Sequence, residues 1–196
     1  LEEKDYKKLN SFFWLFTVDL KSSKIITRSV ISNWMDHNQN YSFKSWELDT
    51  LSKRIISWIA NSNNFYHEGD ESFKISFTNI VKKQLNHLIN EIENTKFFND
   101  KMIGCAAIIL GGLCFKYQLQ YLNIGFQLLK KIINEIFDND GFPKSRNPRQ
   151  VTFYLKYFVF IRELLKDSNS EIPEYLNEII FYLGQSFDFY FEENEN

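Results

Sequence analysis

The spacing of apolar residues is the feature that most constrains the fold of this chain. Apolar side chains recur every three or four residues nearly throughout, as at Leu48, Leu51, Ile55 and Ile59, and this spacing gathers them on one face of an α-helix. The alternation of apolar and polar residues that a half-buried strand shows is hard to find between turns. The sequence therefore predicts an all-α protein.

Helical segments are expected along most of the chain, with short connections between them. They cover about residues 25–34, 45–59, 71–94, 99–115, 117–137, 148–166 and 172–189. Helices joined by short loops are typical of antiparallel hairpins, and no residue-level repeat of the TPR, ankyrin or HEAT kind is visible. We therefore expect one domain over residues 1–196, an incomplete toroid of helical hairpins. Its abrupt ends, at Leu1 and after an acidic tail, predict a fragment truncated at both ends.

The periodicity also predicts which side chains face the core. The first of these helices is expected to bury Ile25, Ile26, Val30, Ile31 and Trp34. In the second, Lys53 and Arg54 fall outside the apolar stripe and are expected to face away from the core. The segment 99–115 is apolar almost all round, which predicts a helix covered on several sides.

Charge and apolar run length argue against two classes of partner. The net charge is -2 and the isoelectric point is near 6.0, so the chain lacks the basic surplus that binding to a phosphate backbone needs. No apolar run reaches the roughly 20 residues of a membrane-spanning helix, the nearest being Met102–Phe115. We expect no nucleic-acid partner and no membrane insertion.

Metal and cofactor signals are also missing from the sequence. The histidines and cysteines stand in unrelated contexts, at His37, His67, His87, Cys105 and Cys114, and none has metal-ligand spacing. The two cysteines lie too far apart along one helix to form a disulfide. No phosphate-binding glycine loop, dinucleotide fingerprint or serine elbow is present. We expect no metal and no cofactor.

The segment 139–148, Asn-Asp-Gly-Phe-Pro-Lys-Ser-Arg-Asn-Pro, interrupts the helical pattern. Asp140-Gly141 is a turn signal, Pro143 imposes an extended backbone before it, and Pro148 suits the first turn of the next helix. This stiff connection presents Lys144, Ser145, Arg146 and Asn147. It is interpreted either as a polar connection between helices or as a loop that carries function.

Further positions are candidates for ligand contact. His37 precedes a polar loop, from which it can reach a ligand. Trp46 is one of four tryptophans whose rings suit either core packing or stacking against a sugar. Asn99 and Asp100 begin a helix, where they either cap its first turn or help its N-terminus bind an anionic group.

Three segments together resemble those of a known family. They are Trp46-Glu-Leu-Asp-Thr-Leu-Ser-Lys-Arg-Ile-Ile-Ser-Trp58, the stretch from Asn99 to Phe115, and Asp140-Gly-Phe-Pro-Lys-Ser-Arg-Asn-Pro148. The first is similar to a Trp-rich segment of that family, and the second to its Gly-Asn-His helix. The third is similar to its Asp-Gly-Gly-His loop, which leads into Ser-Arg-Asn-Pro. These belong to the helical toroid domain of heparinase II/III-like polysaccharide lyases, here in a divergent bacterial form.

The resemblance implies a function and a missing partner domain. In that family a β-sandwich follows the toroid, and the cleft between them holds an acidic polysaccharide that contains uronic acid. The implied reaction is β-elimination, in which one group neutralises the carboxylate, a base removes the C5 proton and an acid protonates the leaving oxygen. A periplasmic location is the family expectation.

The resemblance also implies roles for individual residues. Asn99 matches the family Asn that faces the substrate carboxylate, Arg146 matches the loop Arg, and Asn147 matches the loop Asn of the divergent branch. We expect Asn99 and Arg146 at the carboxylate and Tyr154 as a further catalytic candidate. We expect contributions to substrate binding from Asp100, Asn147, Lys144, Trp46 and His37.

This sequence departs from the family pattern at three expected catalytic positions. The family's two histidines are replaced by Asp100 and Pro143, and its tyrosine falls near Gln150. Tyr154 lies one helical turn further on and is the candidate substitute for the base. The replacements keep an alternative open, a toroid that binds glycan or packs against a partner domain without catalysis. A helical scaffold unrelated to sugars is the third interpretation.

Overall fold

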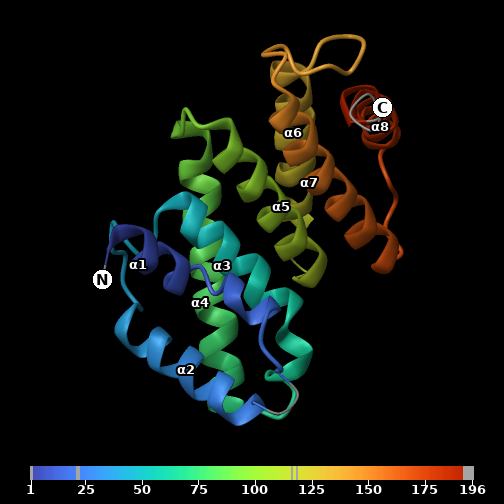
Figure 1. Cartoon of the computed structure of the whole chain (residues 1–196). Coiled ribbons are helices and arrows are strands. Elements are labelled where there is room, and N and C mark those ends of the chain that lie inside the picture. The colour runs from blue at the N-terminus through green and yellow to red at the C-terminus, as the bar shows by residue number, and fades with distance from the viewer. Residues whose placement is uncertain (1, 21–22, 116, 118, 192–196) are drawn as a thin grey trace. The chain divides into compact units, whose positions relative to one another are not determined.

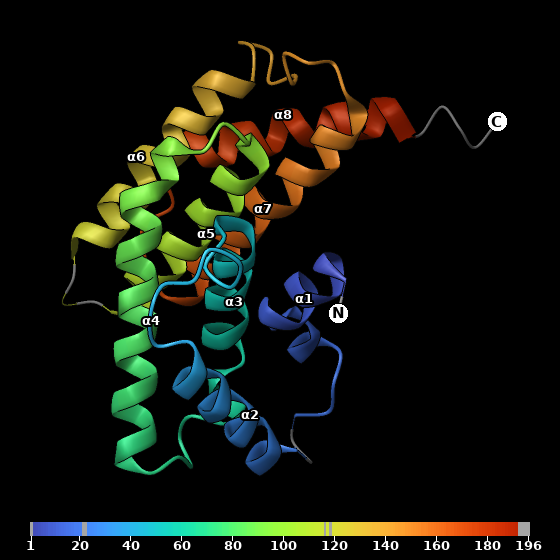
Figure 2. The ribbon, with the colours of Figure 1, turned by 90° about the vertical axis from the view of Figure 1, so that its left-hand side faces the viewer.

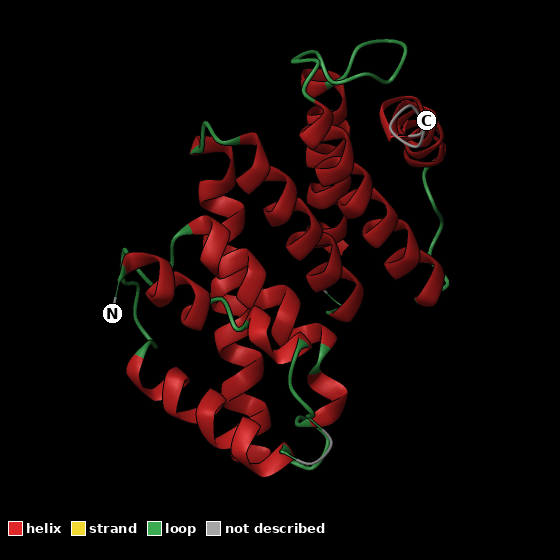
Figure 3. Cartoon of the chain, viewed as in Figure 1, coloured by secondary structure: helices red, strands yellow, loops and turns green. Residues whose placement is uncertain are grey.

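The structure is a computed structural model that describes residues 2–20, 23–115, 117 and 119–191. Helices dominate this part of the chain, and it contains no strand (Figure 3). The predicted all-α class is therefore confirmed. The chain divides into two compact units, Leu1–Gly111 and Gly112–Asn196, with the boundary inside helix α5. The expected single toroid domain stays a prediction.

The helices follow one another along the chain, with the α2–α3 and α6–α7 connections longer than the others between described helices (Figure 1). In chain order they are α1 (Glu3–Asn10), η1 (Phe13–Phe16), α2 (Lys24–His37), α3 (Leu48–Ala60), η2 (Ser62–Asn64), α4 (Glu71–Glu91), η3 (Ile92–Asn94), α5 (Phe98–Cys114), α6 (Leu119–Ile136), α7 (Pro148–Asp167) and α8 (Glu174–Phe191). Each segment expected from the sequence corresponds to one of α2 to α8. The sequence reasoning missed α1, which buries none of its residues and so shows no apolar stripe to detect.

Helix α3 is the centre of the first unit. It packs against α4, α1 and η1, and α2 packs against α4 (Figure 2). Rings from separate elements meet here, since Trp58 of α3 lies 5.2 Å from Phe12 and 5.3 Å from Trp34, centroid to centroid. The predicted apolar stripe of α3 is buried at Leu51, Ile55 and Ile56.

The buried face of α2 differs from the one expected. Ile25 and Ile26 are 74% and 66% exposed, and Val30 is also exposed, whereas Ile31 is buried together with Thr27 and Met35. These three residues are spaced by four positions, so they form the row that faces α4. The expectation that Ile25, Ile26 and Val30 face inward is wrong. The buried face of α2 is centred on Ile31 and includes the polar Thr27, so these three apolar residues lie on the solvent side of the helix.

Arg54 is fully buried, which corrects the expectation that it faces away from the core. Its Nε donates to Gln84 Oε1 at 2.9 Å, and its Nη1 donates to the carbonyls of Asn10 at 2.8 Å and Ser45 at 2.9 Å. Its guanidinium carbon lies 4.1 Å from the centre of a Trp34 ring. Burial lowers the pKa of Arg54 to about 9, so the group is still cationic at neutral pH. Arg54 therefore joins α1, α2, α4 and the segment before α3.

The second unit has its own core. Helices α7 and α8 pack together, and Tyr154 and Phe158 of α7 lie 5.3 Å and 5.8 Å from Phe137, centroid to centroid. Phe137 also forms an isolated antiparallel bridge with Pro143, which closes the loop between α6 and α7. This core fixes the base of that loop.

Both cysteines, Cys105 and Cys114, lie on α5. Cys105 is buried and Cys114 is exposed, and burial raises the thiol pKa of Cys105.

Candidate functional site

The loop between α6 and α7 is organised by Asp138. Its Oδ1 accepts hydrogen bonds from the backbone N–H groups of Asp140, at 3.1 Å, and Phe142, at 2.8 Å. The backbone N–H of Asp138 donates to the Phe142 carbonyl at 3.0 Å. Gly141 adopts φ 76° at the turn, a conformation that glycine reaches without strain. The loop is therefore a closed, hydrogen-bonded turn with a defined shape.

Arg146 is presented at the outer edge of this loop. Its φ is 54°, a left-handed conformation that residues other than glycine adopt seldom. Its Nη2 lies 2.7 Å from Asp138 Oδ2, its guanidinium carbon lies 5.4 Å from the Phe142 ring centre, and its side chain is still 61% exposed. Both contacts orient the guanidinium while leaving most of it open to solvent, and such a group suits a carboxylate or sulfate ligand.

The other loop residues singled out from the sequence have structural partners. Lys144 Nζ donates to the carbonyls of Asn134, at 2.9 Å, and Glu135, at 3.3 Å, near the C-terminus of α6, where a cation is favoured. Asn147 caps α7, since its Oδ1 accepts from the backbone N–H of Arg149 at 3.0 Å. Both residues hold the loop in place, and their expected part in substrate binding stays a prediction.

Tyr154 lies in the core of the second unit. It is fully buried among rings of Phe137 and Phe158, and its hydroxyl has no hydrogen-bond partner in the described part of the chain. Burial raises the pKa of this phenol, which disfavours the phenolate that a base would need. The structure therefore places Tyr154 away from solvent, and its expected catalytic role stays a prediction that this burial does not favour.

Asn99 and Asp100 lie in the first turn of α5. Asn99 is exposed and Asp100 is partly buried. Burial and, to a smaller degree, the carboxylates of Asp49 and Glu47 raise the pKa of Asp100, against the opposing effect of Lys53 and Lys7. Asn99 belongs to the first unit and Arg146 to the second, so the expected convergence of these two residues stays a prediction.

The two aromatic candidates have different surroundings. Trp46 is 2% exposed, and its ring lies 5.4 Å from that of His87 and 6.3 Å from that of Tyr41. His37 is exposed at the end of α2, with Nδ1 2.8 Å from the Asn33 carbonyl oxygen, and lines a cavity of about 400 Å³ beside Trp34. His37 is thus accessible to a ligand, whereas Trp46 offers almost no surface for stacking.

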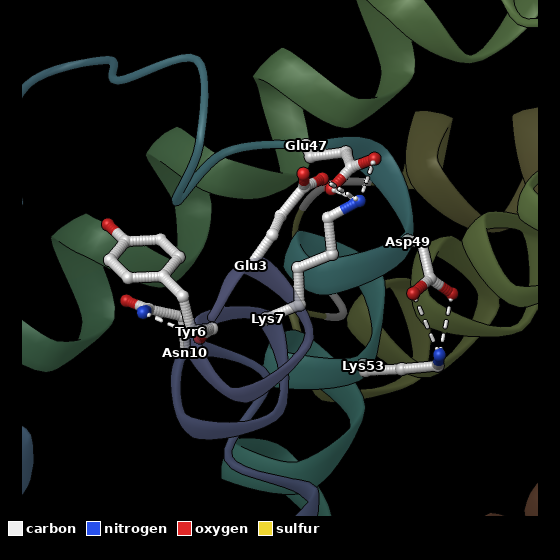
Figure 4. Close-up of polar contacts among 7 residues, drawn as sticks. All are labelled: Glu3, Tyr6, Lys7, Asn10, Glu47, Asp49 and Lys53. Carbon is white, nitrogen blue, oxygen red and sulfur yellow. Dashed lines mark hydrogen bonds and ion pairs between the residues drawn. The ribbon is translucent and has the colours of Figure 1, made fainter. Parts of the chain in front are cut away.

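Charged residues cluster where α1 meets the start of α3 (Figure 4). Lys7 Nζ lies between two carboxylates, 3.0 Å from Glu3 and 2.9 Å from Glu47, and Asp49 pairs with Lys53 at 2.7 Å. The hydrogen bonds and charges of Glu47 and Glu3 raise the pKa of Lys7 to about 12. The sequence reasoning missed this cluster because it did not find α1, although the i, i+4 spacing of Glu3 and Lys7 was a signal for a helix.

Taken together, the described residues define an all-α protein with an exposed arginine on a hydrogen-bonded loop of the second unit and a charged cluster around α1 in the first unit. No three His, Cys, Asp or Glu side chains within the described ranges come close enough to hold a metal ion. None of the described helices is long and apolar enough to cross a membrane. No family model, curated protein or solved structure matches the chain.

Proposed function

We propose that this chain is the helical domain of a polysaccharide lyase that cleaves uronic-acid-containing glycans by β-elimination, its hairpins forming part of a toroid. The observation that carries the proposal is the resemblance of residues 46–58, 99–115 and 140–148 to a heparinase II/III-like helical domain. The all-α fold supports it. So does the position of these segments, which form most of α3, nearly all of α5 and the loop that leads into α7.

Arg146 is the proposed partner of the substrate carboxylate. A guanidinium pairs with a carboxylate through two parallel N–H···O bonds, and the exposure of Arg146 leaves room for such a ligand. Neutralising the carboxylate makes the neighbouring C5 proton more acidic. A base then takes this proton, the C–H electron pair forms the C4–C5 double bond, and the C4–O bond breaks as an acid protonates the departing oxygen.

Asn99 is assigned an independent contribution to glycan binding. Its side chain is exposed in the first turn of α5, and the N-terminus of a helix favours an anionic ligand. Asp100 follows it with a raised pKa, so this carboxyl keeps its proton to a higher pH than an ordinary aspartate. Because Asn99 and Arg146 belong to different units, the contribution of each is tested by its own variant.

The experiment is an elimination assay on heparan sulfate, alginate and other acidic glycans, followed by the ultraviolet absorbance of the unsaturated uronic product. It is run with a longer protein that contains this chain and the following β-sandwich, and in parallel with this chain alone, which we expect to be inactive without that domain. We expect product formation that Arg146→Ala and Asn99→Ala each reduce by at least about tenfold, the loss of one charge-assisted contact. Product formation that is unchanged in both variants would contradict the proposed roles.

A second candidate function is glycan binding without cleavage. The burial of Tyr154 favours it, together with the absence of histidine at positions 100 and 143. It predicts glycan binding that Arg146→Ala weakens, with no unsaturated product on any glycan. A protein that neither binds nor cleaves acidic glycans would exclude both functions.

A further inference from the structure

A cavity of about 680 Å³ lies at the surface of the first unit. Its walls come from α1, from η1 and from the first turns of α3. The volume falls within the range of about 300–1,000 Å³ that small-molecule sites occupy. The cavity is therefore large enough for a ligand, and it lies in a different unit from the Arg146 loop.

One wall of the cavity is a single face of α1. Lys4, Lys7, Lys8 and, just past the helix end, Ser11 all line it. These positions follow the i, i+3, i+4, i+7 spacing that aligns side chains along one face. No residue of α1 is buried, so this face of the helix lines the cavity and is not enclosed in the core.

The lysines of the cavity differ in their partners. Lys7 is held by Glu3 and Glu47, and Lys53 by Asp49 (Figure 4). Lys4 and Lys8 are exposed and form no ion pair within the described part of the chain. The cavity lining holds four lysines and two carboxylates, Glu3 and Asp49, and both carboxylates are paired, with Lys7 and Lys53 respectively. Lys4 and Lys8 are therefore the ammonium groups available to an anion.

An aromatic ring and a fixed backbone complete the cavity. Phe13 of η1 lines it and is only partly buried. Ser11 Oγ donates to the Lys8 carbonyl at 2.8 Å and accepts from the Phe13 N–H at 3.4 Å. This bridge fixes the backbone of Lys8 relative to that of Phe13. An aromatic ring beside two ammonium groups matches a sugar ring that carries an anionic substituent.

We infer that this cavity binds the sulfate or carboxylate group of an acidic saccharide, with Lys4 and Lys8 as its cationic contacts and Phe13 against the sugar ring. The inference rests on the proposed function for its ligand class, and adds a glycan site on the first unit.

The test is a calorimetric titration with a heparan sulfate tetrasaccharide and an alginate tetrasaccharide at low ionic strength. The Lys4→Gln/Lys8→Gln double variant is compared with a matched double variant, Lys96→Gln/Lys130→Gln, which removes two exposed lysines outside the cavity. We expect the first to weaken saccharide binding about tenfold or more and the second to leave it unchanged. Phe13→Leu should weaken binding of the saccharides but not of sodium sulfate. Circular dichroism verifies that every variant is folded.

The outcomes separate this inference from the proposed function. If Lys4→Gln/Lys8→Gln binds like the parent while Arg146→Gln loses binding, the inference is overturned and the proposed function stands. If only the lysine variant loses binding, the inference stands and the proposed role of Arg146 fails. Equal affinity for sodium sulfate and the saccharides would overturn the saccharide assignment. A parent chain that binds neither tetrasaccharide overturns both proposals.

Discussion

At the scale of single residues, Arg54 carries the largest expected effect on stability. It satisfies Gln84 and two backbone carbonyls from inside the first unit. Arg54→Ala leaves these acceptors unpaired and opens a cavity, so the free energy of unfolding should fall by roughly 3 kcal/mol or more. Urea unfolding measures this change in the free energy of unfolding.

The control is Arg162→Ala, which removes a partly exposed guanidinium paired with Glu163 and should cost ~0.5 kcal/mol or less. Equal effects of the two substitutions would contradict the prediction.

The hydroxyl of Tyr154 is expected to contribute nothing to stability. It is buried without a partner among the described residues, and removing an unpaired buried polar group relieves its desolvation cost. Tyr154→Phe should leave the free energy of unfolding unchanged or raise it by up to about 1 kcal/mol. Tyr66→Phe is the matched control, because its hydroxyl lies 3.3 Å from Thr78 Oγ1 and its loss should destabilise. Loss of glycan cleavage in a stable Tyr154→Phe protein would instead establish Tyr154 as a catalytic residue.

Asp100 should make the stability of the protein depend on pH. Its pKa is raised in the folded state, chiefly by burial, so the folded chain holds this proton more tightly than the unfolded chain. The resulting stability is fully present below the ordinary value of 3.8 and is lost as pH rises through the raised pKa. In Asp100→Asn we expect a smaller fall in the free energy of unfolding between acidic and neutral pH. An identical pH dependence in both proteins would refute this assignment.

At the scale of elements, two glycines of the second unit should respond oppositely to the same substitution. A Cβ added at Gly112 of α5 would lie 2.7 Å from the backbone nitrogen of Leu122 and 2.9 Å from its Cα, whereas one added at Gly184 of α8 meets nothing within 4 Å. Gly112→Ala should therefore destabilise the α5–α6 contact by about 1–3 kcal/mol. Gly184→Ala should stabilise by up to about 1 kcal/mol through helix propensity. Thermal unfolding followed by circular dichroism distinguishes the two, and equal shifts would disprove the role of close packing.

The elements show which parts of the fold could be predicted from sequence. Helices with an apolar stripe were predicted within a few residues, because burial imposes the 3.6-residue period. Helix α1 was missed because none of its residues is buried, and its contacts with other elements, such as Lys7 with Glu47 and the Asn10 carbonyl with Arg54, are polar. The buried position of Arg54 was missed because the carbonyls and the indole that receive it lie on other elements, and local periodicity carries no such information.

At the scale of the whole molecule, the candidate site was only partly visible in the sequence. The loop before α7 was identified by its glycine and prolines, which mark any stiff connection. Its organising residue, Asp138, was missed because nothing local distinguishes an aspartate that accepts two backbone N–H groups from an ordinary helix end. The cavity beside α1 is formed by α1, η1 and α3, and only a structure shows that α3 closes a cavity with elements so far from it in sequence.

Because the chain divides into two compact units, we predict that tryptophan fluorescence and circular dichroism will give different urea midpoints when only one unit is destabilised. All four tryptophans, at positions 14, 34, 46 and 58, lie in Leu1–Gly111, so their fluorescence reports on the first unit, while circular dichroism reports on helices of both. Gly141→Ala forces a side chain at φ 76° to within 2.3 Å of Tyr182 Cβ and destabilises the second unit. We expect a lower urea midpoint by circular dichroism and an unchanged midpoint by tryptophan fluorescence. Equal shifts in both signals would mean that the chain unfolds as one cooperative unit.

The unequal burial of the Cys105 and Cys114 thiols determines which of them oxidises when the purified protein is exposed to air. Oxidation proceeds through an accessible thiolate, and Cys114 is the thiol that solvent reaches, whereas Cys105 is enclosed by the core. An internal disulfide would require α5 to break, since the two positions lie too far apart along it. Slow oxidation should therefore link two molecules covalently through Cys114, while Cys105 keeps its thiol until the first unit opens.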